Sequence, residues 1–247
     1  QASDPVALGW MVGSPPPAGK AISAVDGGLY RFPQSRWSMS HWRELFPTRN
    51  ISRGDGPVAV LQRARPQADF GGLTFTPIGA GEPMTWDESL AANYTDGIVV
   101  LHRGRIVYER YFGALAEDRQ HIAFSVTKSF MGTLAAMLVA DGALDPSAPV
   151  AKYIPELADS GFGDATVQQV LDMTTALDYS ELYADPKSNF VEYAIAAGML
   201  PPPAGYAGPR TVYDYARGIA RNGMHGEKFG YRSPNTDVVG WLIARVP

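Results

Sequence analysis

Apolar residues recur at helical spacing along one stretch of the chain, from Phe124 to Ala140. Positions three and four apart lie on one face of a helix, so such a stripe is typical of an amphipathic helix packed on a core. The stripe consists of Met131, Leu134, Ala135, Leu138 and Val139. The Asp141-Gly142 pair that follows is a typical helix stop. The pattern therefore predicts a helix that begins near Ser125 and ends near Ala140.

A strand hairpin is expected directly before this helix. Residues 98–101 (Ile-Val-Val-Leu) and 106–108 (Ile-Val-Tyr) are rich in β-formers, and Arg103-Gly104 between them is a typical turn. A single hairpin is too small a sheet to be stable. We therefore expect an antiparallel sheet with further strands, backed by helices.

The second half of the chain has a helical and loop-rich pattern. Helices are predicted from Thr166 through Leu171, from Thr211 to Ala220 and from Thr236 to Val246. The buried side of the last helix consists of Val238, Val239, Leu242 and Ile243. No strand follows it, so we expect the remaining strands of the sheet to lie outside residues 1–247.

Three regions are expected along the chain. Residues 1–85 are rich in Gly and Pro with scattered aromatics and predict an irregular N-terminal arm wrapped over a domain. Residues 86–145 hold the hairpin and the apolar helix, which predict the start of an α/β sandwich. Residues 146–247 predict a helical insert domain.

The composition narrows the function classes. The chain has 247 residues, 45% hydrophobic and 19% charged, as expected of a globular protein. Its net charge of −4 argues against nucleic acid and anionic membranes as partners. No apolar run approaches the roughly 18 residues of a membrane helix. Without cysteine there is no disulfide or thiolate metal site, and the four histidines show no metal-ligand spacing, so no cofactor is expected.

The candidate chemistry lies at the start of the apolar helix, in Ser125-Val126-Thr127-Lys128. Residues three apart on a helix are neighbours on one face, so the lysine amine can take the proton of the serine hydroxyl. Ser-x-x-Lys is the nucleophile motif of penicillin-recognising enzymes. A Ser-x-x-Lys motif also occurs by chance, because serine and lysine are common residues. The alternative interpretation is a solvent-facing first turn of the helix with an extended Lys128 side chain.

Several segments together resemble the serine β-lactamase-related family, closest to its 6-aminohexanoate-dimer hydrolase and family VIII esterase branch. The similar segments include Phe124 to Ser129, the hairpin before them, Tyr231-Arg232-Ser233-Pro234-Asn235-Thr236-Asp237, Gly9-Trp10-Met11 and Tyr153-Ile154-Pro155-Glu156-Leu157. The resemblance implies an α+β fold, in which an α/β sandwich with an antiparallel sheet carries an all-helical insert domain and the active site lies between them. It also implies a third motif on a late strand, which residues 1–247 do not contain. We therefore expect a C-terminal remainder of the same polypeptide.

The resemblance also implies roles for five residues. Ser125 is the expected nucleophile, Lys128 its base and Tyr231 the group that protonates the leaving group. Tyr183 and Ser233 are expected to contact substrate, with Ser233 in place of the asparagine found in β-lactamases. The alternatives are a core aromatic near a helix start for Tyr231 and a packed loop tyrosine for Tyr183.

The function expected from these features is hydrolysis of small carboxylic esters or linear amides through an acyl-enzyme. The alternatives are a β-lactamase or D-alanyl peptidase, which Ser233 argues against, and an acyl-binding or sensor module without turnover. The sequence does not establish activity on 6-aminohexanoate dimer, because the stretch after Asp185-Pro186 shows no clear counterpart of the acidic residue used by that branch. The aromatic arm could serve a homodimer, and both a periplasmic and a cytoplasmic location of a bacterial protein stay open.

Overall fold

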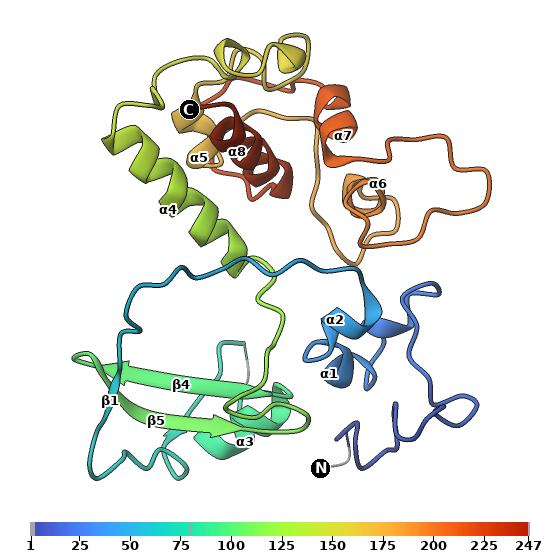
Figure 1. Ribbon diagram of the computed structural model, residues 1–247, viewed down its shortest axis with the longest axis vertical. Coiled ribbons are helices and arrows are strands. Elements are labelled where there is room, and N and C mark those ends of the chain that lie inside the picture. Colours follow the sequence, from blue (N-terminus) through green and yellow to red (C-terminus); the bar gives the residue numbers. More distant parts are fainter. Residues whose placement is uncertain (1–2, 80, 247) are drawn as a thin grey trace. The chain divides into compact units, whose positions relative to one another are not determined.

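The computed structural model describes residues 3–79 and 81–246, and the chain divides into two compact units, Gln1–Ile122 and Ala123–Pro247 (Figure 1). The boundary falls between the predicted hairpin and the predicted nucleophile helix. The three-part division of the chain into arm, sandwich start and helical insert stays a prediction. None of the described helices is both long and apolar enough to span a membrane.

The first unit is built around the predicted hairpin, which is confirmed. Strands β4 (Gly97–His102) and β5 (Arg105–Tyr111) pair antiparallel. Arg103 and Gly104 between them both have positive φ, which matches a tight hairpin turn whose twist fits that of the strands. The short strand β1 (Gln62–Arg63) adds to the other edge of β5 in parallel, so the described sheet has the order β1-β5-β4.

A second small sheet leads into a helix that the sequence pattern did not reveal. Strands β2 (Thr74–Phe75) and β3 (Met84–Thr85) pair antiparallel, and α3 (Trp86–Ala92) follows directly. Thr85 and Glu88 form a capping box that satisfies backbone donors at the start of α3. This Thr-x-x-Glu signature is present in the sequence and marks the helix start.

The N-terminal region contains a core of its own. Its elements are η1 (Gly28–Tyr30), α1 (Ser35–Ser38) and α2 (Trp42–Leu45). Ile22, Leu29 and Trp37 are buried together, with Trp10, Met11, Tyr30, Trp42, Leu45 and Phe46 packed around them. The aromatics of this region thus pack together in one core. The residues of that core come from the arm itself.

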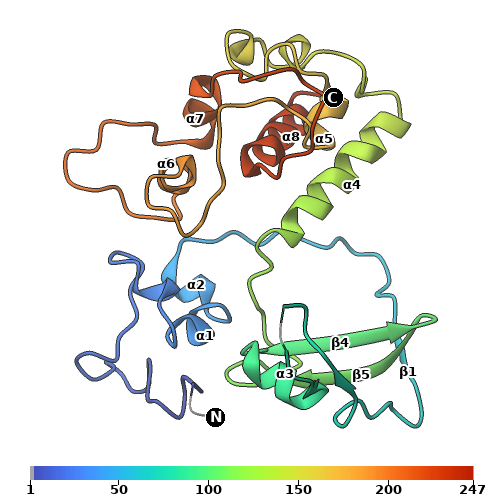
Figure 2. The same ribbon diagram turned by 180° about the vertical axis from the view of Figure 1, so that it is seen from behind.

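The second unit is helical. Figures 1 and 2 show α4 (Val126–Ala140) beside α8 (Ser233–Arg245), and α8 also packs against α5 (Val167–Leu171) and α7 (Val212–Gly218). The remaining elements are η2 (Val150–Lys152), η3 (Pro155–Leu157) and α6 (Asn189–Ala196). The four predicted helices are confirmed, although α8 begins three residues before the predicted Thr236. Helix α6 lacks a predicted counterpart.

The core of the second unit lies where these helices meet. Its largest fully buried side chains are Phe162, Leu144, Ile154, Leu157, Leu242, Val150, Val167, Val170 and Val238. Burying each such side chain stabilises the fold by about 1.5–3 kcal/mol. Gly240 of α8 lies close to Met131 of α4, so the two helices can approach each other closely at this point.

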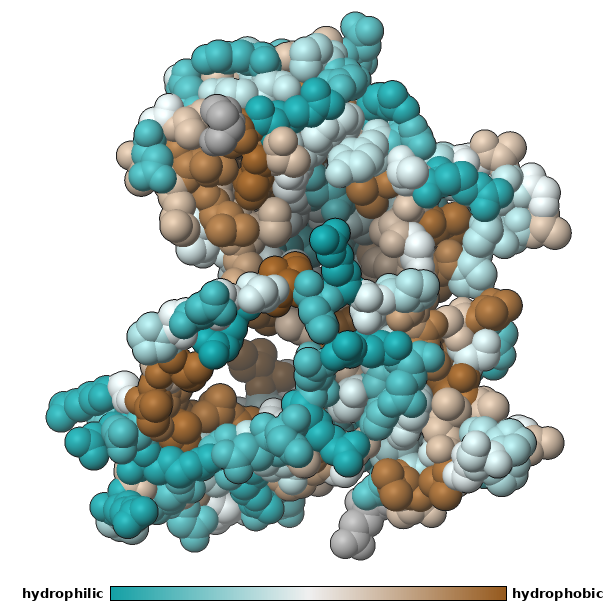
Figure 3. All heavy atoms as spheres, viewed as in Figure 1, coloured by the Kyte–Doolittle hydropathy of each residue, from teal (hydrophilic) through white to brown (hydrophobic). Residues whose placement is uncertain are grey.

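Helix α4 has apolar residues on two faces. Ala135 is buried and Met131, Leu138 and Val139 pack on the core, as predicted. The prediction for Leu134 is wrong, because its side chain is 46% exposed. It belongs to an exposed row with Val126, Phe130 and Met137. Figure 3 shows hydrophobic residues at the surface of the second unit, in the region of α4 and α8.

Gly163 provides a test of packing in the second unit. A Cβ there would lie 2.2 Å from the carbonyl oxygen of Ala158, which is backbone and cannot swing away. Gly163→Ala is therefore expected to lower the free energy of unfolding by about 1–3 kcal/mol, measured by urea denaturation. Gly218→Ala is the matched control, because a Cβ at Gly218 of α7 meets nothing within 4 Å and should leave stability unchanged or slightly higher. Equal stability of the two variants would contradict the packing described.

Candidate active site

Ser125 and Lys128 face each other at the start of α4. Ser125 directly precedes the helix and Lys128 lies in its first turn, so the side chains share one face. The Lys128 Nζ lies 3.0 Å from the Ser125 Oγ, which is hydrogen-bond distance. Ser125 is exposed, and Lys128 is half-buried. This geometry differs from an extended lysine that reaches into solvent.

The backbone before Ser125 is strained. Phe124 has φ of +40°, in the left-handed region that a bulky side chain rarely adopts. Its carbonyl oxygen accepts a hydrogen bond from the N–H of Thr127 at 3.0 Å, which begins the turn of α4. Residues in this region cost on the order of 1–3 kcal/mol and cluster at functional sites. The turn places Ser125 at the exposed N-terminal end of the helix.

The Tyr231 hydroxyl contacts the same oxygen, although Tyr231 is distant from Ser125 in sequence. Its hydroxyl lies 2.7 Å from the Ser125 Oγ, across 106 residues of sequence. The Lys128 Nζ lies 5.2 Å from the centre of the Tyr231 ring, within reach of a cation–π interaction. Tyr231 is 39% exposed, so it is not a core aromatic. Ser125, Lys128 and Tyr231 thus meet at one oxygen atom.

The loop before Tyr231 is fixed by backbone hydrogen bonds to residues 173–176. The N–H of Gly230 donates to the carbonyl of Met173 at 2.9 Å, and the N–H of Gly226 donates to that of Thr174 at 2.9 Å. The guanidinium of Arg232 donates to the carbonyl of Thr175 at 3.0 Å. These bonds hold the chain on both sides of Tyr231.

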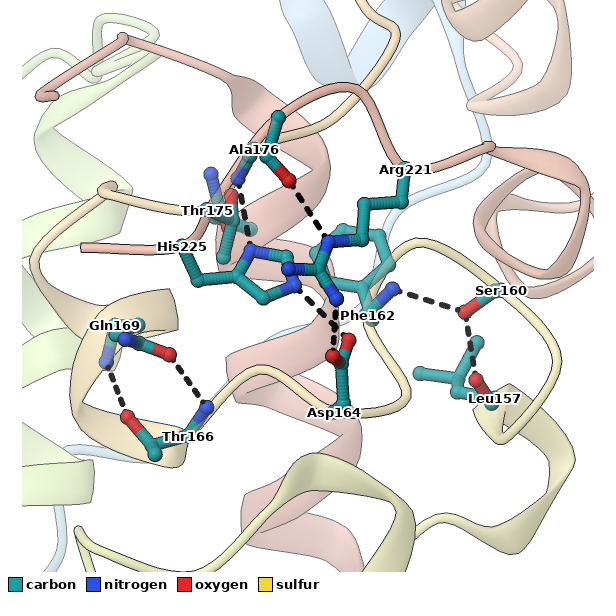
Figure 4. A network of polar contacts seen from close by, with 12 residues as sticks. Leu157, Ser160, Phe162, Asp164, Thr166, Gln169, Thr175, Ala176, Arg221 and His225 are labelled. Carbon is teal, nitrogen blue, oxygen red and sulfur yellow. Dashed lines mark hydrogen bonds and ion pairs between the residues drawn. The ribbon is translucent and has the colours of Figure 1, made fainter. Parts of the chain in front are cut away.

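A buried histidine fixes the earlier part of this loop (Figure 4). The His225 Nδ1 accepts a hydrogen bond from the N–H of Ala176 at 2.9 Å, so its proton is on Nε2, which donates to Asp164 at 3.1 Å. Arg221 forms an ion pair with the same carboxylate. Desolvation acts to raise the pKa of Asp164, but the His225 hydrogen bond and the Arg221 charge outweigh it, and the pKa lies below its ordinary value. The network ties residues 221–225 to Asp164 and Ala176.

Tyr183 and Ser233 come together at Glu181. The Tyr183 hydroxyl donates to the Glu181 carboxylate at 2.7 Å, and so does the Ser233 hydroxyl at 2.7 Å. Tyr183 is 65% exposed, whereas Ser233 is 6% exposed. Desolvation, and then the hydrogen bond to Glu181, raises the pKa of Tyr183, so its hydroxyl stays protonated as a donor. The substrate contacts expected of both residues stay predictions, and for Ser233 an indirect role through Glu181 fits its burial better.

Glu181 is a residue of this site that the sequence reasoning missed. Its spacing from Tyr183 could have indicated it, since the side chains of residues two apart in an extended segment point to the same side of the backbone. The pairing with Ser233 spans 52 residues and has no local signal.

A second carboxylate, Asp237, lies one turn after Ser233 on α8. Burial raises the pKa of Asp237 to about 6, although a hydrogen bond from Tyr193 and the charge of Lys128 act in the opposite direction. The Tyr193 hydroxyl donates to Asp237 at 2.8 Å. Glu181 adds to the rise through like-charge repulsion. The site therefore contains a carboxyl group that titrates close to neutral pH.

The raised pKa of Asp237 predicts a pH-dependent stability. Between about pH 4 and about pH 6 the folded state holds a proton that the unfolded state has released, so the free energy of unfolding falls as the pH rises. The shift from 3.8 to about 6 corresponds to on the order of 3 kcal/mol above this window. Asp237→Asn is therefore expected to stabilise the protein above about pH 6 by up to that amount, with little effect near pH 4.

Urea denaturation at several pH values measures this difference. Asp159→Asn is the matched control, because Asp159 is exposed and its substitution should leave the pH profile unchanged. If the free energies of unfolding of wild type and Asp237→Asn differed by the same amount at all pH values, the raised pKa of Asp237 would be contradicted.

The surroundings of Ser125 favour negative charge. Ser125 lies at the N-terminus of α4, so the positive end of that helix dipole lies beside its oxygen. Charge that develops on Ser125 or on an attacked carbonyl would be stabilised there. Within the described part of the chain, no group of three or more His, Asp or Glu residues is placed to hold a metal ion.

Known proteins are similar to this chain over most of its length. The 6-aminohexanoate-dimer hydrolase of Paenarthrobacter ureafaciens is 34% identical over 214 residues, which cover 87% of this chain and 51% of that protein. A solved structure from Bacillus anthracis, assigned by inference as a 6-aminohexanoate-dimer hydrolase, matches with a TM-score of 0.80 and 27% identity over 93% of this chain and 58% of that chain. The chain thus spans about half the length of the Paenarthrobacter ureafaciens relative.

The similarity to the Bacillus anthracis structure confirms the predicted α+β fold of the β-lactamase/transpeptidase type. The family model described as Beta-lactamase matches residues 89–247, more than half of the chain, and includes both motifs that meet at Ser125. This chain therefore belongs to the β-lactamase family.

Proposed function

We propose that this chain carries the nucleophile of a serine hydrolase that acts on small carboxylic esters or linear amides. The observation that carries the proposal is the meeting of Lys128 and Tyr231 at the Ser125 Oγ, at 3.0 Å and 2.7 Å. A serine hydroxyl is a weak nucleophile until an adjacent base takes its proton. Here two proton-carrying groups lie within hydrogen-bond reach of it.

In acylation, Lys128 and Tyr231 each take part in one proton transfer. The Ser125 oxygen attacks the carbonyl carbon, and its proton passes to the Lys128 amine. The tetrahedral intermediate collapses when the bond to the leaving alcohol or amine breaks, and the Tyr231 hydroxyl gives that group a proton. Lys128 then returns its proton to Tyr231, so the site is neutral overall with an acyl group on Ser125.

Deacylation reverses these roles. A water molecule attacks the acyl carbon and gives its proton to the Tyr231–Lys128 pair. The bond to Ser125 breaks, the serine oxygen regains a proton, and the carboxylic acid leaves. General acid–base catalysis of this kind contributes about 10²–10⁴-fold to a rate.

The substrate class rests on the relative and on Ser233. The Paenarthrobacter ureafaciens relative is named for hydrolysis of 6-aminohexanoate dimer, which is a linear amide. Ser233 lacks the side-chain amide of the β-lactamase motif, and its hydroxyl is bound to Glu181. Hydrolysis of 6-aminohexanoate dimer itself is outside the proposal, because the stretch after Asp185-Pro186 offers no clear acidic counterpart.

A fluorophosphonate probe tests the proposal on the full-length protein. We expect a single adduct in the intact-mass spectrum, mapped to Ser125 by peptide sequencing, together with repeated turnover of p-nitrophenyl butyrate. Absence of an adduct, or an adduct that persists in Ser125→Ala, would contradict the assignment of the nucleophile.

The same experiment separates the alternatives. Stoichiometric labelling of Ser125 without ester turnover would favour an acyl-binding module. Nitrocefin hydrolysis at rates comparable to those of short-chain esters would favour a β-lactamase. Neither alternative has a structural observation of its own in the described residues.

A further inference from the structure

Glu181 is a carboxylate that binds two residues of the candidate site at once. Its Oε2 accepts a hydrogen bond from the backbone N–H of Ser233 at 2.6 Å. Its Oε1 accepts from the Ser233 hydroxyl at 2.7 Å and from the Tyr183 hydroxyl at 2.7 Å. Hydrogen bonds to an ionised acceptor are about twice as strong as neutral ones. One side chain therefore fixes the relative positions of Ser233 and Tyr183.

The segment that carries Glu181 is itself tied to α6. The Asn189 side chain accepts a hydrogen bond from the N–H of Ser180 at 3.1 Å. The Ser188 hydroxyl accepts from the N–H of Leu182 at 3.1 Å and donates to the carbonyl of Ser180 at 2.9 Å. The backbone is thus held on both sides of Glu181, so the position of its carboxylate relative to Ser233 and Tyr183 is fixed.

The path from Glu181 to the reacting atoms runs through the first turn of α8. Ser233 is the first residue of α8, and its N–H is one of the donors that a helix leaves unpaired at its start. A carboxylate there caps the helix from a distant segment. Tyr231 lies two residues earlier, with its hydroxyl 2.7 Å from the Ser125 Oγ. A shift of this first turn would therefore move Tyr231 relative to Ser125.

We propose that Glu181 is a positioning residue. It holds Tyr231 at Ser125 through the first turn of α8, and it holds Tyr183 through a direct hydrogen bond. This inference rests on the proposed hydrolase function. Glu181 does not touch the Ser125 oxygen; it acts through Ser233. Glutamine keeps one acceptor oxygen and loses the negative charge. With that oxygen at the Ser233 N–H, its NH₂ group would face the Ser233 and Tyr183 hydroxyls, which would have to turn and accept, so the charge-assisted bonds to both hydroxyls are lost.

Kinetics of Glu181→Gln in the full-length protein test the proposal. With active sites counted by fluorophosphonate labelling, we expect kcat for p-nitrophenyl butyrate to fall about 10–100-fold, since misplacement by about 1 Å costs on the order of 10²-fold. KM should change by less than about 3-fold, because Tyr231 acts on the chemical step. In a Tyr231→Phe background the same substitution should cost less than about 3-fold, because the positioned hydroxyl is already gone.

The controls separate positioning from general stability. Glu192→Gln, on the exposed side of α6, should leave kcat and KM unchanged. If Glu181→Gln does not fold, Ser233→Ala serves instead, because it removes one of the two Ser233 bonds and should lower kcat in the same way, again only while Tyr231 is present. Equal losses of kcat with and without the Tyr231 hydroxyl would overturn the inference, and so would an unchanged kcat in folded Glu181→Gln.

Failure of the inference is distinguishable from failure of the proposed function. If Ser125→Ala retains full ester hydrolysis, the hydrolase assignment itself is wrong. If Ser125 is labelled and required while Glu181→Gln behaves like wild type, the hydrolase assignment holds and only the role of Glu181 is rejected.

Discussion

Ser125→Ala is expected to lower kcat for p-nitrophenyl butyrate by roughly 10⁴-fold or more, as removal of the nucleophile does in other serine hydrolases. The Ser125 Oγ is the atom at which the Lys128 and Tyr231 side chains converge, so alanine removes the acceptor of both contacts. No covalent intermediate can then form. The fluorophosphonate adduct should disappear together with the activity, and the intact-mass spectrum measures this directly.

The fold should survive this substitution. Ser125 is exposed and its hydroxyl does not cap α4, so the free energy of unfolding should change by no more than about 0.5 kcal/mol. Ser147→Ala, in a turn outside the site, is the matched control and should keep full activity. Ester hydrolysis by Ser125→Ala within tenfold of the wild-type rate would show that another residue is the nucleophile.

Tyr231→Phe is expected to lower kcat by about 10²–10⁴-fold, the contribution usual for a general acid or base. The substitution removes one oxygen atom and keeps the ring, so the contact between the ring and Lys128 can persist. The effect should be larger for an amide than for a p-nitrophenyl ester, because an amine leaving group needs a proton and p-nitrophenolate does not. Parallel kinetics with both substrates measure this difference.

Tyr153→Phe is the control for loss of a tyrosine hydroxyl elsewhere in the same unit. Its hydroxyl accepts a hydrogen bond from the backbone N–H of Asp145 at 2.9 Å, so some stability is lost but kcat should be unchanged. Equal losses of kcat on ester and amide in Tyr231→Phe would argue that the hydroxyl serves Ser125 activation rather than the leaving group.

The parts of the fold that the sequence pattern predicts are those with strong local signals. The hairpin of β4 and β5 follows from β-branched runs around Arg103-Gly104, and α4 follows from apolar spacing between Ser125 and Asp141. Both depend on contacts between residues near in sequence, where periodicity and turn chemistry decide the structure. Ser125 and Lys128 are neighbours for the same reason.

The parts that could not be predicted depend on contacts distant in sequence. The side chain of Leu134 lies on the exposed face of a helix with apolar residues on two sides, and periodicity alone cannot tell which face meets the core. The contact of Tyr231 with Ser125 spans 106 residues, and only the family resemblance indicated it. Glu181 was missed because its partner Ser233 is brought close by the packing of α8, which no local pattern encodes.

The left-handed backbone of Phe124 has a consequence for how this site can evolve. Glycine at position 124 would adopt φ of +40° without penalty and would on that ground make the protein more stable. It would also widen the range of conformations open to the turn that presents the nucleophile. A β-branched residue would raise the strain further. We therefore expect that a substitution at position 124 that relieves the backbone strain raises stability and lowers the rate of catalysis.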